Sequence, residues 1–143
     1  MSAPPADDIQ DVAIAEAIRR LEERTSGEIR VFVTRHRPAN PVREARRQFD
    51  VLMMNRTPLR NAALLYFAPA NRGFAVAMDE ALTFRAGDGF AETIHAAMDS
   101  DWTGGRFHQA VVAGVEAAGI ELSRHFPRSK LDRNDLANQM LRD

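Results

Sequence analysis

Hydrophobic residues recur every three to four positions in several stretches of the chain, which is the period of an amphipathic helix. Asp7 or Asp8 is placed to cap the first of these helices, and Asn40 followed by Pro41 to cap and begin the second. Residues 79–89, rich in charge and glycine, are expected to form a loop. The helices are predicted over about residues 8–24, 41–53, 90–100 and 105–125.

Three shorter stretches have the pattern of strands. Hydrophobic and polar residues alternate over 28–36, which predicts a half-buried strand. Residues 61–68 are almost wholly apolar, as in a strand buried on both faces. Residues 74–78 form a third apolar run after the turn-forming residues 69–73, so the second and third strands are predicted to form a β-hairpin.

The order of these elements predicts an α/β fold. A strand, a helical crossover and a second strand form a right-handed parallel pair, and the hairpin adds an antiparallel third strand. We therefore expect a small mixed sheet with helices on both faces, an α/β sandwich. Residues 1–7 are expected to be a flexible arm, 8–127 a single domain, and 128–143 a polar tail with a helix from Asp132 as one option.

Composition narrows the function without identifying it. The 143 residues, 45% hydrophobic and 27% charged, suit one globular domain, and the absence of cysteine excludes thiol catalysis, cysteine-bound metals and disulfides. Nineteen basic and 20 acidic residues leave no basic excess for general nucleic-acid binding. No apolar run approaches the roughly 20 residues of a membrane helix, and no targeting segment is visible. A cytoplasmic location is expected.

Several segments together resemble the TPM domain family. They are TSGEIRV at residues 25–31, TPLRNAALL at 57–65, RGFAV at 72–76, and the stretch 107–127 that ends in Phe-Pro. The resemblance covers about residues 9–127. It implies an α/β sandwich like that of the plant thylakoid-lumen members, which are linked to photosystem II repair and reported as acid phosphatases. Some bacterial members bind calcium. Residues 78–81 read Met-Asp-Glu-Ala where many relatives have Gly-Asp-x-Gly.

The predicted topology brings polar residues to one edge of the sheet. Glu28 begins the first strand, Arg60 and Asn61 begin the parallel second strand, and Asp79 and Glu80 follow the returning third strand. Carboxylate oxygens are the ligands that Ca²⁺ and Mg²⁺ prefer, so Glu28, Asp79 and Glu80 are candidate metal ligands. Arg60 and Asn61 are candidate contacts for an anion or phosphate. A purely structural role, with Glu28 paired to Arg60, is the alternative.

A second group of candidates is basic. Arg43, Arg46 and Arg47 lie close together on the second helix, and Arg35 and Arg37 leave the opposite end of the first strand. Clustered guanidinium groups bind phosphate or an acidic partner. The alternative is a solvated helix face whose ion pairs contribute little.

Three functions remain open on the sequence alone. The first is a binding or accessory module, with an unknown protein partner and with Ca²⁺ or Mg²⁺ as its candidate cation. The second is a metal-assisted acid phosphatase at the same carboxylates, with metal-activated water as the nucleophile. The third is a protein-interaction domain that uses the arginine face of the second helix. Whether the chain is an enzyme is left undecided.

Overall fold

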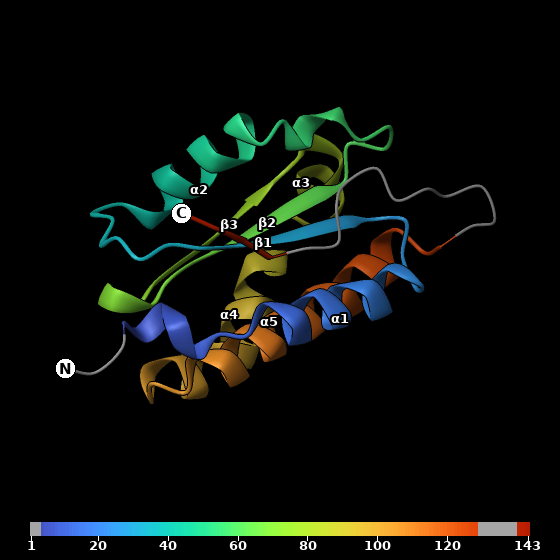
Figure 1. The fold of residues 1–143 in the computed structure, drawn as a ribbon. Coiled ribbons are helices and arrows are strands. Elements are labelled where there is room, and N and C mark those ends of the chain that lie inside the picture. Colours follow the sequence, from blue (N-terminus) through green and yellow to red (C-terminus); the bar gives the residue numbers. More distant parts are fainter. Residues whose placement is uncertain (1–3, 129–139) are drawn as a thin grey trace.

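The fold was obtained as a computed structural model, which describes residues 4–128 and 140–143. These residues form a mixed α/β structure with a single sheet (Figure 1). In chain order its helices and strands are α1 (Asp11–Glu22), β1 (Glu28–Val33), α2 (Pro41–Val51), β2 (Ala62–Ala68), β3 (Gly73–Met78), α3 (Glu80–Ala86), α4 (Gly89–Thr103), α5 (Phe107–His125) and β4 (Met140–Arg142); the short 3-10 turns η1 (Pro5–Asp8), η2 (Met54–Arg56) and η3 (Pro69–Asn71) connect them.

The sheet has the strand order β3-β2-β1-β4. β1 runs parallel to β2, with Glu28 opposite Ala62, and β2 pairs antiparallel with β3. The predicted parallel pair and hairpin are therefore confirmed. The fourth strand, β4, runs parallel to β1 on its other side, with Val31 opposite Met140. Sequence analysis did not identify β4, because three residues are too few to show an alternating pattern.

Helices cover both faces of the sheet, as expected. α2 lies on one face, and α1, α4 and α5 lie on the other (Figure 1). Alternate residues of β1 divide between two hydrophobic cores: Val31 belongs to the three-helix side, and Phe32 to the α2 side. All seven residues of β2 are buried, which agrees with its continuous apolar sequence.

Two local predictions were wrong. The first helix begins at Asp11, not at residue 8, because the preceding residues form the 3-10 turn η1. The stretch expected to be a loop contains the seven-residue helix α3, which Asp79 caps by accepting the Glu80 N–H. Only Leu82 of α3 is buried, so the sequence of this helix lacks the repeating hydrophobic positions from which a helix is predicted. The helix considered from Asp132 lies outside the described residues.

Two glycines allow α5 to pack closely on its neighbours. A Cβ at Gly27, just before β1, would come within 2.8 Å of Leu122 Cδ2 on α5. A Cβ at Gly119 on α5 would come within 2.8 Å of Leu21 Cβ on α1. Real Cβ atoms do not approach other heavy atoms this closely, so a side chain at either position would force a neighbour to move. At Gly27 that neighbour is the mobile end of a leucine side chain, whereas at Gly119 it is the Cβ of Leu21, which cannot move without its backbone.

Candidate functional site

Arg60 and Asp79 form a tight ion pair where β2 begins and β3 ends. The Asp79 N–H donates to Ala62 O at 2.9 Å, which fixes this carboxylate next to the first residue of β2. Arg60 Nε and Nη2 donate to the two oxygens of Asp79 at 2.8 and 3.0 Å. The hydrogen bond with Asp79 raises the pKa of the Arg60 guanidinium. Asp79 is buried, and both of its oxygens are occupied by groups of the chain itself.

The other predicted residues of this edge lie nearby but play different parts. Glu80 is exposed and stands 3.5 Å from Arg60 Nη1. Glu28 is buried at the start of β1, level with the start of β2. Asn61 is 1% exposed, and neither polar atom of its side chain has a hydrogen-bond partner among the described residues. The topology therefore brings the predicted residues to one end of the sheet.

These carboxylates do not form a ready ligand set. Within residues 4–128 and 140–143, no three acidic or histidine side chains lie close enough together to hold a metal ion. Asp79 accepts hydrogen bonds from Arg60 and from the first turn of α3, so its role in the structure is to hold Arg60 against the start of α3. A cation at Glu28, Asp79 and Glu80 remains a prediction that no contact in the structure tests.

The opposite end of β1 opens into a polar pocket of about 530 Å³. Thr34 follows β1 directly, and the loop 35–40 leads from it into α2, whose first turn Asn40 caps by accepting the Arg43 N–H at 3.1 Å. Ligands of open α/β sheets bind at the carboxyl ends of the parallel strands, which is where this pocket lies. Its walls are Thr34, His36, Arg37, Pro38, Ala39, Asn40, Arg43, Glu44, Arg47, Gln48, Tyr66 and Asp143.

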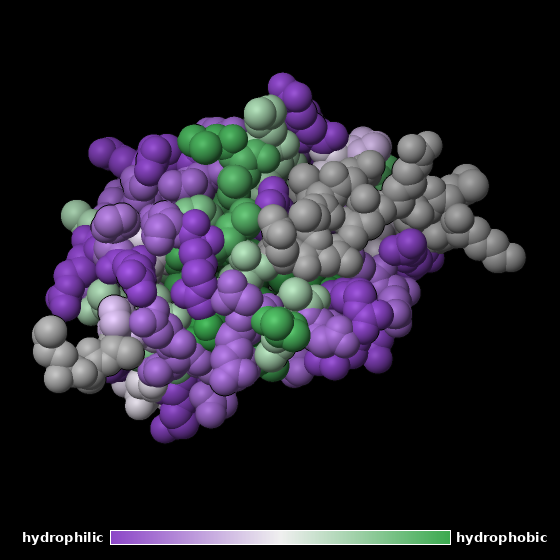
Figure 2. All heavy atoms as spheres, in the orientation of Figure 1, coloured by the Kyte–Doolittle hydropathy of each residue, from purple (hydrophilic) through white to green (hydrophobic). Residues whose placement is uncertain are grey.

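The predicted arginine face of α2 is divided by the fold. Arg43 and Arg47 line the pocket, whereas Arg46 lies over the Phe49 ring at 4.7 Å and donates to Met78 O at 2.8 Å. Arg47 pairs with Glu44 at 2.8 Å. Among the described residues Arg43 has no acidic partner, and the same holds for Arg37 in the loop before α2. Figure 2 shows hydrophilic residues gathered over the part of the molecule where α2 begins.

The floor of the pocket is polar and buried. Thr34 is completely buried, and its hydroxyl donates to Asp143 Oδ2 at 2.9 Å. Tyr66 of β2 is 2% exposed. Burial raises the pKa of the Tyr66 phenol, and the negative charges of Glu44 and Asp143 add to this rise, while a hydrogen bond with Thr34 and the charge of Arg47 act against it. The pocket therefore combines buried hydroxyl groups with two guanidinium groups, those of Arg37 and Arg43, that have no acidic partner in the described part of the chain.

Sequence analysis named only part of this pocket. It named the arginines, but it missed Thr34, His36, Tyr66 and Asp143. The position of Thr34 at the carboxyl end of a parallel strand was a usable signal. Asp143 gave none, because nothing in the sequence shows that the residues after 139 return to the edge of β1.

The fold and the pocket together define an α/β sandwich domain with a polar site at one end of its sheet. The family model of the TPM domain matches residues 7–120, so the chain belongs to the TPM domain family, as the sequence motifs indicated. The chain is similar to the NMR structure of the BA42 protein from the psychrophilic bacterium Bizionia argentinensis. The two share 33% identity with a TM-score of 0.86, over 96% of this chain and 94% of that chain.

No curated protein matched the sequence significantly. None of the helices in the described part of the chain is long and apolar enough to cross a membrane.

Proposed function

We propose that this chain is a binding module that recognises an acidic segment of a partner protein in the pocket at the carboxyl end of β1. The observation that carries the proposal is that two arginines of this pocket form no ion pair with the described residues. Arg37 and Arg43 both line the pocket, and neither has an acidic partner among the described residues. Guanidinium groups are well suited to bind carboxylates, because their fixed N–H groups match the two carboxylate oxygens.

The size of the pocket favours a peptide segment over a single small anion. A volume of about 530 Å³ lies within the range of sites for organic ligands, and the pocket is formed by a loop and a helix turn that an extended chain can follow. Its polar walls and mixed charges differ from the more hydrophobic interfaces of obligate complexes. This proposal keeps the sequence-based expectation of a protein partner. It replaces the predicted face of Arg43, Arg46 and Arg47 by Arg37 and Arg43, which line the pocket without an acidic partner among the described residues.

The test is a binding titration of the full chain with a hexaglutamate peptide at low salt, followed by NMR. We expect binding that weakens as salt is added, because exposed charges are screened. The double variant Arg37→Ala/Arg43→Ala should bind about fivefold more weakly, if each exposed contact contributes about 0.5 kcal/mol. The double variant Arg19→Ala/Arg124→Ala is the matched control, since it also removes two exposed arginines and neither of them lines the pocket.

Two results would contradict this proposal. One is the absence of peptide binding at low salt. The other is an equal loss of affinity in the control and in the double variant, which would show only a general charge effect. If inorganic phosphate binds at the pocket and the peptide does not, the partner is a small anion and the protein partner is wrong.

A divalent cation at Glu28, Asp79 and Glu80 is the second candidate function. The buried Asn61 side chain favours it, because its oxygen is a suitable ligand and lacks a hydrogen-bond partner among the described residues. We expect Ca²⁺ or Mg²⁺ to raise the Tm of the chelated wild type and not that of Glu80→Gln. Glu80 is the suitable position for this change because its side chain is the exposed one of the three. Without such a shift, a metal-assisted phosphatase at this edge has no support.

A further inference from the structure

The carboxylate of Asp143 occupies the pocket in the way that a bound anion would. Its Oδ2 accepts the Thr34 hydroxyl at 2.9 Å, and its Oδ1 accepts the Arg35 N–H at 3.3 Å. His36 Nε2 lies 3.9 Å from Oδ2. The Thr34 oxygen itself accepts the His36 N–H at 3.0 Å, so the same hydroxyl group also orders the backbone of the loop that follows β1. Three consecutive residues after β1 thus surround one carboxylate.

We infer that the Thr34 hydroxyl and the Arg35 N–H form a carboxylate subsite, which the chain fills with its own Asp143 until an acidic residue of the partner replaces it. This inference rests on the proposed function, and it names the chemistry and the regulation of that site. Asp143 is an internal competitor of the partner. It is 31% exposed, so an incoming carboxylate can reach the same donors.

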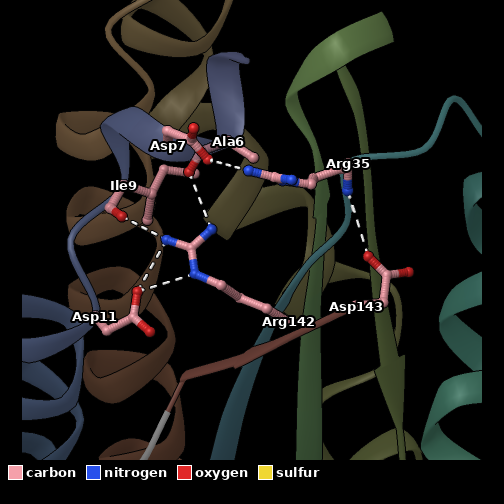
Figure 3. Close-up of polar contacts among 7 residues, drawn as sticks. All are labelled: Ala6, Asp7, Ile9, Asp11, Arg35, Arg142 and Asp143. Atoms are coloured by element: carbon pink, nitrogen blue, oxygen red, sulfur yellow. Dashed lines mark hydrogen bonds and ion pairs between the residues drawn. The ribbon is translucent and has the colours of Figure 1, made fainter. Parts of the chain in front are cut away.

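The attachment of β4 makes this exchange a local event. Consecutive residues of a strand point to opposite sides, and Arg142 and Asp143 do so in Figure 3. The Arg142 guanidinium donates to Ala6 O at 3.1 Å, to Ile9 O at 2.6 Å and to the Asp11 carboxylate at 2.8 Å. Arg142 therefore fastens β4 to the segment before α1, and Asp143 can leave its subsite without releasing the strand.

The charges of the pocket favour the exchange. Asp143 satisfies Thr34 and the Arg35 amide, but no ion pair joins it to Arg37 or Arg43 among the described residues. A partner segment with two or more carboxylates could take the place of Asp143 and reach these two guanidinium groups as well. The exchange then keeps the number of hydrogen bonds at the subsite unchanged and adds contacts between carboxylates and guanidinium groups.

The closing experiment compares peptide affinity in the full-length wild type, Asp143→Asn and Asp7→Asn. Asp7→Asn is the matched control, because it also removes one carboxylate charge. Asp7 does not line the pocket and pairs with the side chain of Arg35, whereas the subsite uses the Arg35 backbone N–H. If Asp143 leaves its subsite in roughly one molecule in ten, removing its charge should tighten binding of hexaglutamate by up to about tenfold. Asp7→Asn should bind like the wild type or only slightly more tightly.

NMR during the same titration tests whether the subsite itself is exchanged. In the wild type, saturation with the peptide should shift the Arg35 amide and leave the Met140 amide of β4 in place. In the Asp143→Asn background, Thr34→Ala should abolish the gain in affinity and Thr34→Ser should keep it, because serine retains the hydroxyl.

The outcomes separate this inference from the proposed function. If the wild type binds through Arg37 and Arg43 but Asp143→Asn binds no more tightly than Asp7→Asn, the inference is wrong and the proposed function stands. If no protein in the set binds the peptide, the proposed function fails and the inference with it. A shift of the Met140 amide that matches that of Arg35 would show release of β4 and overturn the local exchange.

Discussion

At the residue scale, a single buried polar residue has a defined structural role at each end of the sheet. Asp79 is buried at one end, where Arg60 and the α3 amide hold its two oxygens. Thr34 is buried at the other end, where its hydroxyl bridges the His36 amide and Asp143. A buried polar atom without a partner is destabilising, so these bonds are part of the fold as well as of the candidate sites.

Tyr66 is a reporter of the pocket, because it is the only tyrosine of the chain. Burial raises its pKa above the ordinary value of 10.0, and Asp143 contributes to the rise. We expect Asp143→Asn to lower the pKa of Tyr66 relative to the wild type while leaving it raised, because burial is the larger cause. An absorbance titration of tyrosinate measures this, with Asp7→Asn as the control.

The same shift predicts how stability depends on pH. In the unfolded chain Tyr66 loses its proton near pH 10.0, whereas in the folded chain it keeps its proton to higher pH. The folded state then binds more protons, so this contribution is fully present below pH 10.0 and is lost as the pH rises through the folded pKa. Urea unfolding of Tyr66→Phe, which cannot ionise, should show a smaller loss above pH 10.0. An equal loss in both proteins would contradict the assignment.

At the element scale, the packing of α5 depends on where its glycines face. Gly119 lies against α1, and a Cβ there would come within 2.8 Å of Leu21 Cβ. A Cβ at Gly114 would lie 3.5 Å from Met98 Sδ and 3.7 Å from Phe67 Cζ, which are ordinary contact distances. The same helix therefore contains one glycine that packing requires and one that it does not.

This difference predicts opposite effects of the same substitution. Gly114→Ala should stabilise the protein by about 0.5–1 kcal/mol, because alanine favours the helix and the added methyl group fits. Gly119→Ala should destabilise it, because overpacking of a core typically costs about 1–3 kcal/mol and exceeds the gain in helix propensity. Urea unfolding of the two variants measures both free energies. Equal effects of the same sign would refute the packing assigned to Gly119.

At the scale of the whole molecule, Arg142 connects the last described segment of the chain to the first, across more than 130 positions of sequence. Its guanidinium joins β4 to the segment from Ala6 to Asp11, and Arg35 at the end of β1 pairs with Asp7 in the same region (Figure 3). The segment before α1 is thus tied to two adjacent strands.

Loss of this link should loosen one edge of the sheet only. In Arg142→Ala, we expect faster hydrogen exchange at the β1 amides that pair with β4, over Val31–Val33, and unchanged exchange at the pairs of β2 with β3. Arg142→Lys keeps the charge but not the forked donors, so it should rescue exchange only in part. Uniform acceleration across the sheet would mean that β4 supports the whole fold instead.

The sequence by itself determined the elements whose pattern is long and strongly apolar. Three patterns were enough to predict three strands, a parallel pair and an α/β sandwich. They are the alternation over 28–36, the continuous apolar run at 61–68, and the turn-forming residues 69–73 that lead into the next apolar run. These features are local, because periodicity and turn residues act over a few positions. The convergence of Glu28, Arg60 and Asp79 at one edge followed from that topology.

Only the tertiary structure decided which polar groups meet and what each one binds. It paired Arg60 with Asp79, separated Arg46 from Arg43, and brought Asp143 to Thr34 across more than a hundred positions of sequence. β4 and α3 were equally invisible, since three and seven residues carry too little pattern of their own. Such contacts depend on long-range packing and on the burial of individual polar atoms, and neither is encoded in the spacing of residues along the chain.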